Sequence, residues 1–464
     1  MTETEEKKRR RAAEPEPGPA SGRALVLVPL PRARRAEEGT PDRDAEARIE
    51  EAAGLARAID LEVVEAAGVP LSGFRPATLF GAGKVEELGA TIAHDRVELV
   101  VVDHALTPVQ QRNLEKAWKA KVIDRTGLIL EIFGERAQTR EGRLQVELAH
   151  LTYQKSRLVR SWTHLERQRG GFGFLGGPGE TQIEADRRVI SERIDKIKKE
   201  LQTVVTRRRL QRRSRKRSGY PVVALVGYTN AGKSTLFNAL TRSGVFADNR
   251  LFATLDPTLR RVDLPSGTGI ILSDTVGFVS DLPTTLVAAF RATLEEVAEA
   301  DLVLHVRDIA HADSEAQAGD VAAVLTDLDI DVNDPARVIE VWNKIDLMPP
   351  DERPPRIIPP RAATGKSDGS PLVVSVAALT GEGLPDLLAA IEGRIAEDDV
   401  VYRVELRGAA VGDLHRLYEL GDVLERHDRE DGAIGATVRV PVETVDRFRA
   451  AFPGARRDGP APAA

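Results

Sequence analysis

The chain has 464 residues, 42% hydrophobic and 30% charged, which is enough for about three globular domains. It contains no cysteine, which excludes disulfide bonds, cysteine-based zinc sites and thiol catalysis. The formal net charge of −6 hides an asymmetry, because residues 136–217 carry 22 Lys and Arg against 9 Asp and Glu while the rest of the chain has a net charge of −19; this one segment is suited to an anionic partner.

Residues 1–22 are charged and rich in proline, so we expect a disordered tail. No apolar stretch follows the first eleven residues, which argues against a secretory signal. No run of eighteen apolar residues is present, and we therefore expect no transmembrane segment and a cytoplasmic protein.

Residues 23–135 are predicted to form a small N-terminal α/β domain with a mainly parallel sheet. Strand-like runs cover 23–30, 61–64 and 97–103, and helical patterns cover 42–59, 84–94 and 107–118. The segment Gly81–Lys84 resembles half of a phosphate-binding loop, but Thr78 stands where the first glycine is needed. We interpret it as a turn and helix cap.

Residues 136–218 are predicted to form a basic helical hairpin. One helix carries apolar residues at helical spacing at Leu144, Leu148, Leu151, Leu158, Trp162 and Leu165, and the other at Ile183, Ile190, Ile194, Ile197 and Leu201. The glycine-rich stretch 170–179 between them cannot be helical, so it forms the tip. A basic run, 206–218, with eight basic residues within 207–217, is expected to end the hairpin.

The remaining chain divides into a core domain at 219–396, a C-terminal α/β domain at 397–453 and a tail at 454–464 that we expect to be frayed. Within the core, 221–226 is strand-like, 235–241 helical and 372–376 the last strand, after a loop at 349–370 rich in proline and glycine. The C-terminal domain is predicted as strand 400–406, helix 413–420, strand 436–440 and helix 442–452.

Three motifs in the core indicate guanine-nucleotide chemistry. The stretch Gly227–Ser234 (GYTNAGKS) fits a phosphate-binding loop, in which backbone N–H groups surround the phosphates and Lys233 reaches the β- and γ-phosphates. Asp274–Gly277 (DTVG) fits the element that meets the metal and the γ-phosphate. Asn343–Asp346 (NKID) fits the element whose carboxylate pairs with guanine. Their order and spacing predict a GTP hydrolase that uses GTP and releases GDP.

The hydrolytic centre needs Mg²⁺ and a threonine that senses the γ-phosphate. Ser234 and Thr254 are the predicted metal ligands, with Thr258 as the competing threonine and Asp274 acting through water. We assign catalytic roles to Lys233, Thr254 and Gly277. The predicted nucleotide-binding residues are Gly227, Tyr228, Thr229, Asn230, Ala231, Gly232, Lys233, Ser234, Thr235, Phe252, Ala253, Thr254, Leu255, Asp256, Asp274, Thr275, Val276, Gly277, Asn343, Lys344, Ile345, Asp346, Ala377, Ala378 and Leu379.

Two positions near the phosphate site bear on the rate of intrinsic turnover. Phe278 follows Gly277 where many small GTPases have a water-orienting glutamine, so a partner or an ion must complete the site. Asn230 is compatible with a potassium-binding asparagine, and loop capping by its side chain is an equal alternative. Ala377 stands where a serine is usual in the last guanine loop, which leaves backbone contacts at 377–379.

The chain resembles the HflX family of translation-related GTPases. The resemblance rests on Gly177–Gln182 (GPGETQ) with Glu184, Asp186, Arg187 and Arg188, together with Gly81–Leu88, the phosphate loop, Phe252–Thr258 (FATLDPT) and Asp274–Phe278. It implies an α/β fold in which a P-loop GTPase core follows a small α/β domain with a long antiparallel helical hairpin and precedes a small C-terminal α/β domain.

The same resemblance implies a cytoplasmic, monomeric protein that binds the large ribosomal subunit and its RNA, and that splits stalled or idle ribosomes. Phe172 and Phe174 at the tip suit base stacking, and Arg167, Arg169, Arg187 and Arg188 suit phosphates. One alternative is an assembly or storage factor that clamps large subunits without splitting ribosomes. Another is an RNA-modifying GTPase, against which the hairpin signature argues.

Overall fold

The computed structural model describes residues 22–31, 44–168, 178–217, 220–242, 251–252, 254–280, 291–360, 370–396, 399–429, 432–440 and 442–458. These residues form two compact units. The first runs to Leu201 and also contains Leu251 and Phe252, and the second contains the others from Gln202 onward. Residues 1–21 of the N-terminal tail lie outside the described residues, but 454–458 of the segment expected to be frayed are described and contain the two-residue strand β15 (Arg456–Arg457), so that expectation was wrong there.

The first unit begins with a four-stranded sheet in the order β2-β1-β3-β4, in which every pair is parallel. Its strands are β1 (Arg23–Pro31), β2 (Glu62–Leu71), β3 (Leu99–Val102) and β4 (Lys121–Asp124). Its helices are α2 (Ala45–Arg57), α3 (Ala82–His94), α4 (Pro108–Trp118) and α5 (Arg125–Arg136). Most of β1 is buried, as expected for a parallel strand inside an α/β domain.

The predicted mainly parallel α/β domain is therefore confirmed, and Gly81 is the N-cap of α3, as predicted for the GAGK segment. The sequence did not predict β4 or α5. Strand β4 has only four residues and begins with an exposed lysine, so its apolar signal is short. Helix α5 follows without a break, because Asp124 ends the strand and caps the helix by accepting a hydrogen bond from Gly127 N at 2.8 Å.

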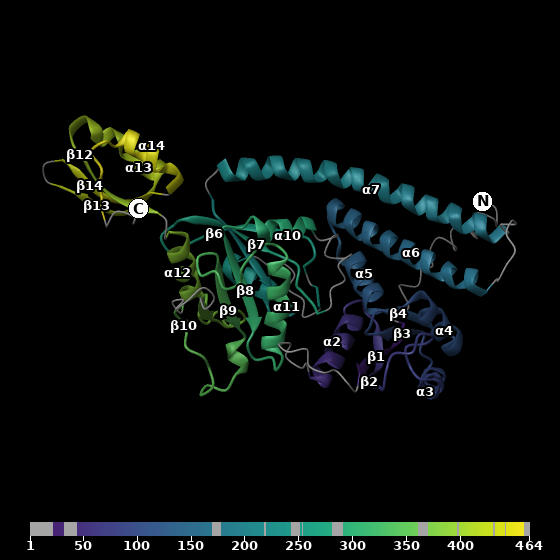
Figure 1. The fold of residues 1–464 in the computed structure, drawn as a ribbon. Coiled ribbons are helices and arrows are strands. Elements are labelled where there is room, and N and C mark those ends of the chain that lie inside the picture. The colour runs from purple at the N-terminus through teal and green to yellow at the C-terminus, as the bar shows by residue number, and fades with distance from the viewer. Residues whose placement is uncertain are drawn as a thin grey trace, which may run out of the picture. The chain divides into compact units, whose positions relative to one another are not determined.

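Helices α6 (Arg140–Gln168) and α7 (Pro178–Arg217) form the predicted hairpin, and Figure 1 shows them side by side. Leu144, Ile194 and Ile197 are buried, and Arg193 Nε donates to Glu147 Oε1 at 2.7 Å. Helix α7 runs through the basic stretch to Arg217, so the last part of the hairpin is helical. Arginine favours helices, so a basic composition does not stop one. Phe172 and Phe174 lie outside the described residues.

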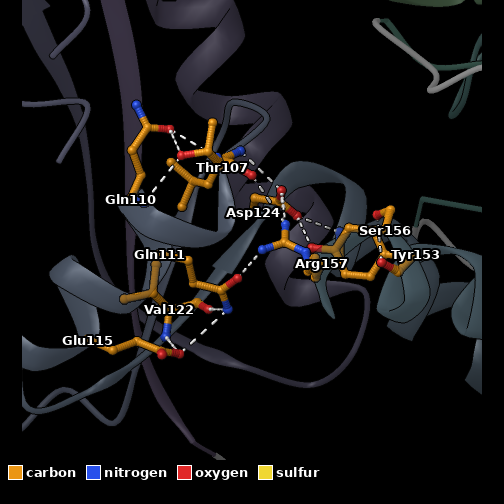
Figure 2. Close-up of polar contacts among 11 residues, drawn as sticks. Thr107, Gln110, Gln111, Glu115, Val122, Asp124, Tyr153, Ser156 and Arg157 are labelled. Atoms are coloured by element: carbon orange, nitrogen blue, oxygen red, sulfur yellow. Dashed lines mark hydrogen bonds and ion pairs between the residues drawn. The ribbon is translucent and has the colours of Figure 1, made fainter. Parts of the chain in front are cut away.

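One buried carboxylate attaches α6 to the sheet of the first unit (Figure 2). Asp124 is 2% exposed and accepts hydrogen bonds from Tyr153 Oη at 2.6 Å and Arg157 Nη2 at 2.5 Å. Arg157 also pairs with Gln111 of α4. Burial, reinforced by Asp124, raises the pKa of Tyr153 well above its usual range. The hairpin is therefore bonded to the same residue that caps α5.

The second unit contains a seven-stranded sheet in the order β10-β11-β9-β8-β5-β7-β6. Its strands are β5 (Val222–Gly227), β6 (Thr258–Asp263), β7 (Gly269–Asp274), β8 (Leu302–Asp308), β9 (Val338–Asn343), β10 (Ile357–Ile358) and β11 (Leu372–Ser375). The five central strands are parallel, and the edge strands β6 and β10 are antiparallel. Parallel pairing brings the carboxyl ends of β5, β7, β8 and β9 to one edge, where ligands bind in open α/β sheets.

Helices α8 (Lys233–Thr241), α10 (Arg291–Ala298), α11 (Ser314–Thr326) and α12 (Leu384–Ile395) accompany this sheet (Figure 1). The core includes Val223, Leu225, Leu236, Phe237, Leu304 and Val341, all fully buried. The insert 349–370 was predicted as a loop, but it contains the two-residue strand β10, which pairs with β11. Two residues are too few to produce a periodic signal in the sequence.

The last part of the second unit is an antiparallel sheet in the order β13-β14-β12-β15. Its elements are β12 (Val400–Leu406), α13 (Leu414–Leu420), β13 (Asp422–Asp428), β14 (Ile434–Val440), α14 (Val445–Ala451) and β15 (Arg456–Arg457). Both helices lie on one face of this sheet (Figure 1), and the order of elements is that of a ferredoxin-like fold. The predicted strand–helix–strand–helix missed β13 and β15, because residues 424–428 are exposed and β15 is short.

Within the described ranges, no helix is both long and apolar enough to cross a membrane.

Candidate active site

The phosphate-binding loop joins the end of β5 to the start of α8. Gly227 has φ +152°, and a β-carbon there would collide with the carbonyl oxygen of Val306. Gly232 has φ +92°, and a β-carbon there would collide with the side chain of Asn343. Only glycine suits both places. The loop therefore passes close to its neighbours and ends at the N-terminus of α8, an arrangement that favours phosphate.

Lys233 is held inside the loop in this structure. Its Nζ donates to the carbonyl oxygens of Gly227 at 3.0 Å and Tyr228 at 2.7 Å. Burial lowers the pKa of Lys233 to about 8, and Asp274 acts in the opposite direction. A β-carbon on Gly277 would lie 3.0 Å from Lys233 Nζ. The lysine is thus beside the glycine predicted to meet the γ-phosphate, and an anion there would favour its charged form.

Three oxygen-bearing side chains meet at the carboxyl end of β7. Ser234 Oγ donates to Asp274 Oδ2 at 2.7 Å, Thr254 Oγ1 donates to the same oxygen at 2.8 Å, and the two hydroxyls are 2.9 Å apart. Thr258, the competing threonine, is the first residue of β6, where it pairs with the backbone of Asp274. The structure therefore brings Thr254 to the predicted metal ligand Ser234.

This group suits a magnesium ion. Asp274 is 0% exposed, and its Oδ1 is buried without a hydrogen-bond partner. Burial raises the pKa of Asp274, while Ser234, Lys233 and Thr254 oppose that rise. A cation would supply the missing partner and favour the carboxylate, and hydroxyl and carboxylate oxygens are the ligands that Mg²⁺ prefers. No cluster of three or more His, Cys, Asp or Glu suited to a metal occurs in the part of the chain that the structure describes.

The segment after Gly277 pairs with the phosphate-binding loop. Phe278 N donates to Gly227 O at 3.1 Å, and Thr229 N donates to Phe278 O at 2.7 Å. Ser280 N donates to Tyr228 Oη at 2.9 Å. Phe278 is 2% exposed, so its side chain packs inside and has no polar group to orient water. The role of the Tyr228 hydroxyl was missed at the sequence level, because it depends on this pairing.

Asn343, at the end of β9, joins the phosphate loop to the last guanine loop. Its Nδ2 donates to Ala231 O at 2.9 Å, and its Oδ1 accepts from Ala378 N at 3.0 Å. Asn343 is 2% exposed. Because both ends of its amide are occupied, this residue holds the two loops in register. Lys344 has φ +67° and donates from Nζ to Asp308 Oδ2 at 2.7 Å.

Asp308 was not predicted as a site residue. It is the last residue of the apolar strand β8, which lies beside β9 in the sheet. A polar residue at the end of a buried strand was the signal that could have identified it. Asp346 lies in a short 3-10 helix, Ile345–Leu347, and is half-buried. Leu379 directly follows Ala378 in the last guanine loop and is 82% exposed. Asn343 therefore bonds the backbone of 377–379 to the segment that carries the Asp346 carboxylate.

The other predicted site residues occupy three kinds of position. Thr275, Val276, Leu255 and Ile345 are buried, and Thr275 Oγ1 donates to Leu225 O at 2.5 Å. Asn230 is exposed with φ +60°, while Thr235 and Asp256 are half-buried. Phe252 belongs to the first unit, where its side chain packs against Phe133, and Ala253 lies outside the described residues.

Family models match most of the chain. They are described as GTP-binding GTPase N-terminal (residues 46–134), GTP-binding GTPase Middle Region (136–215), 50S ribosome-binding GTPase (222–344) and HflX C-terminal domain (362–449).

Several relatives are named GTPase HflX, and two of them cover most of this chain. The one from Magnetococcus marinus is 51% identical over 82% of this chain and 86% of its own length. The one from Escherichia coli is 42% identical over 87% of this chain and 92% of its own length.

Among solved structures, a GTP-binding protein from Sulfolobus solfataricus in complex with GDP is similar over 80% of this chain and 98% of its own, with 21% identity and a TM-score of 0.42. The chain belongs to the HflX family of GTPases, and it binds and hydrolyses GTP.

Proposed function

We propose that this GTPase binds the large ribosomal subunit in its GTP state and separates stalled or idle ribosomes into subunits. The observation that carries the proposal is the pair of long helices α6 and α7, which account for most of the basic segment 136–217. Clustered positive charge on an extended element suits the phosphates of RNA. The description of the matched model, 50S ribosome-binding GTPase, supports the same partner.

The nucleotide roles follow from the loops. Ser234 and Thr254 would hold Mg²⁺, with Asp274 acting through water, and Lys233 would neutralise the β- and γ-phosphates. Thr254 and the N–H of Gly277 would sense the γ-phosphate, so loss of that phosphate on hydrolysis releases both contacts. GTP binding therefore sets the shape of the protein, and hydrolysis resets it.

Intrinsic turnover is slow in this proposal, and the large subunit accelerates it. The supporting observation is Phe278, which is 2% exposed at the position of the usual water-orienting glutamine. A site without a group to orient the attacking water depends on a partner for full transition-state stabilisation.

Potassium is a further proposed cofactor, held by Asn230 against the phosphates. Asn230 is exposed in the loop and has φ +60°, so its side chain is free to turn toward a bound nucleotide. We expect KCl to raise turnover over an equal concentration of NaCl, and Asn230→Ala to abolish that difference. Steady-state GTP hydrolysis in the two salts measures it. A potassium response that survives in Asn230→Ala would leave only loop capping for this residue.

The hairpin would contact ribosomal RNA. Arg187 and Arg188 of α7 are exposed, and Arg188 is paired only loosely, at 3.8 Å, with Glu192. Such side chains remain available to phosphate oxygens, since exposed ion pairs contribute little. The aromatic residues predicted for base stacking, Phe172 and Phe174, lie outside the described residues. Ribosome engagement implies a cytoplasmic location, and we infer that a monomer is the active form.

Sedimentation of intact ribosomes with the protein and a non-hydrolysable GTP analogue tests the proposal. We expect free subunits with the wild-type protein. Arg187→Glu with Arg188→Glu should reduce splitting. It should also make the slope of log affinity for ribosomes against log salt concentration shallower by about one for each lost phosphate contact. GTP affinity should not change. An equal charge reversal at Arg447 and Arg449, exposed on α14, serves as the matched control.

The outcomes separate the alternatives. Protein bound to large subunits or to intact ribosomes without release of free subunits would favour the assembly or storage factor. Protein that does not sediment with ribosomes in either nucleotide state would contradict both. Replacing Phe172 and Phe174 by alanine at saturating GTP adds a test of the tip, because full splitting by that variant would reduce the tip to a structural turn.

A further inference from the structure

The side chain of Thr229, in the phosphate-binding loop, is buried with its hydroxyl unpaired. Thr229 is 6% exposed, and its Oγ1 makes no hydrogen bond to any residue that the structure describes. The hydroxyls of Ser234 and Thr254, by contrast, both bond to Asp274. A hydroxyl can donate one hydrogen bond and accept two, and burying it unpaired costs free energy. Packing alone therefore does not explain a threonine at this position.

The backbone of Thr229 is bonded to the segment that contains Gly277. Thr229 N donates to Phe278 O at 2.7 Å, and Phe278 N donates to Gly227 O at 3.1 Å. These two bonds flank Tyr228, which forms a parallel bridge with Phe278. The loop and this segment are thus joined on both sides of Tyr228, so the Thr229 side chain is held at a fixed place beside Gly277.

The side chain of Thr229 lies against Gly277 and close to Lys233. A β-carbon built on Gly277 would lie 3.0 Å from Thr229 Cγ2 and 3.0 Å from Lys233 Nζ. The methyl group and the amine therefore approach the same point, and the Thr229 hydroxyl is on the same β-carbon as that methyl group. In the function proposed above, Lys233 and the N–H of Gly277 both meet the γ-phosphate. The unpaired hydroxyl is thus a neighbour of the two groups that would hold this phosphate.

Hydrolysis needs a polar group that orients the attacking water at the γ-phosphate. Phe278 is 2% exposed and apolar, and Gly277 has no side chain. The hydroxyl of Thr254 is already bonded to Ser234 and Asp274 at the predicted metal site. Thr229 brings a buried polar group to the place where these residues bring none.

We propose that Thr229 is a catalytic residue, whose hydroxyl accepts a hydrogen bond from the attacking water and donates one to a γ-phosphoryl oxygen. This inference rests on the roles of Lys233 and Gly277 in the function proposed above. In the reaction, the water oxygen bonds to the γ-phosphorus, and the bond from that phosphorus to the β–γ bridging oxygen breaks. The electron pair leaves on GDP, and a proton of the water passes to a γ-phosphoryl oxygen, which gives GDP and inorganic phosphate. Thr229 keeps its own proton throughout.

Threonine suits this role better than a more flexible hydroxyl-bearing residue would. Branching at the β-carbon restricts χ1, and the contact of the methyl group with Gly277 fixes which way the hydroxyl turns. A single neutral hydroxyl stabilises less transition-state charge than a cationic or metal-bound group does. Turnover by the isolated protein is therefore slow, and a partner can still accelerate it.

Single-turnover hydrolysis by the isolated protein with Mg²⁺ tests this role. Thr229→Val keeps the shape of the side chain and removes the hydroxyl. We expect the rate at saturating GTP to fall about ten- to a hundredfold, the effect of losing a hydrogen bond to a charged group. The affinity for a non-hydrolysable GTP analogue should fall by less than the rate, because the bond is strongest in the transition state. Thr229→Ser should restore most of the rate.

Ser273→Ala is the matched control. Ser273 is 0% exposed in β7, and its Oγ also has no hydrogen-bond partner within the described part of the chain. It is not among the predicted nucleotide contacts, so Ser273→Ala should hydrolyse GTP at the wild-type rate. Neither Thr229→Val nor Ser273→Ala should lower the melting temperature of the nucleotide-free protein, because each removes a buried hydroxyl that makes no hydrogen bond there.

Three outcomes would overturn the proposal. The first is a wild-type rate in Thr229→Val, and the second is an equal loss in Thr229→Val and Thr229→Ser. The third is a loss seen in KCl but not in NaCl, which would make the hydroxyl a ligand of potassium.

These measurements are independent of ribosome splitting, because they use no ribosomes. The sedimentation test can therefore fail while the role of Thr229 stands, and the reverse also holds. Gly277→Ala tests the assumption that the two share, since its methyl group would crowd Lys233 Nζ. If Gly277→Ala hydrolyses GTP normally, the γ-phosphate is not held there, and the role of Thr229 is wrong together with the phosphate contacts of Lys233 and Gly277.

Discussion

Replacing Asp346 by asparagine should weaken GTP binding by roughly a hundredfold, or about 3 kcal/mol. The carboxylate is predicted to accept two hydrogen bonds, from the N1 and N2 donors of guanine. In asparagine, the amide NH2 group would face one of these donors, so that hydrogen bond would be lost. Xanthine carries a carbonyl at position 2, so the same substitution should raise the affinity for xanthosine triphosphate. Asp346 is half-buried and lies three residues after Asn343, whose side chain is bonded to Ala231 O.

Competition of GTP and xanthosine triphosphate for a fluorescent nucleotide measures the effect. Asp351→Asn is the matched control, because Asp351 is exposed five residues further along and has no predicted contact with the base. If Asp346→Asn binds GTP as tightly as wild type, the assignment of Asp346 as the residue that recognises guanine is wrong. A loss of both nucleotides together would indicate local unfolding, which the melting temperature would reveal.

Removing the hydroxyl of Ser234 or of Thr254 should reduce GTP hydrolysis by about two to three orders of magnitude, the scale of losing one contact that stabilises transition-state charge. The two changes should differ in binding. Ser234→Ala should weaken GDP and GTP alike in Mg²⁺, since Ser234 would hold the metal in both states and both nucleotides carry the β-phosphate that the metal neutralises. Thr254→Ala should weaken only the GTP state.

Thr258→Ala is the control for this pair, because the sequence left Thr258 as the competing switch residue. Its backbone pairs with Asp274 in the β6–β7 ladder, so we expect near-normal hydrolysis. Single-turnover rates over a range of Mg²⁺ concentrations measure the three variants together. A large loss in Thr258→Ala with normal turnover in Thr254→Ala would reverse the assignment and contradict the metal site proposed here.

Local patterns in the sequence were enough for the nucleotide chemistry and much of the fold. The phosphate loop is recognisable because Gly227 and Gly232 have backbone angles that glycine favours, so the chemistry requires particular residues at particular spacing. The parallel N-terminal sheet and the hairpin followed from long periodic runs. Short or polar elements escaped, among them β4, β10 and β13, because their apolar signal is brief or absent.

What the sequence alone determined is the class of chemistry and a basic hairpin: short motifs indicate a guanine nucleotide and predict a metal-binding hydroxyl, and apolar residues at helical spacing indicate the hairpin. The sequence favoured Thr254 over Thr258 as the partner of Ser234, and the tertiary structure supplies the contact itself, because the path of the chain brings the Thr254 hydroxyl to Ser234. The tertiary structure also placed Phe252 on Phe133 and Tyr228 Oη on Ser280 N. Such contacts join residues far apart in the chain, and no local periodicity records them, because they depend on where the sheet edges and helix ends come together.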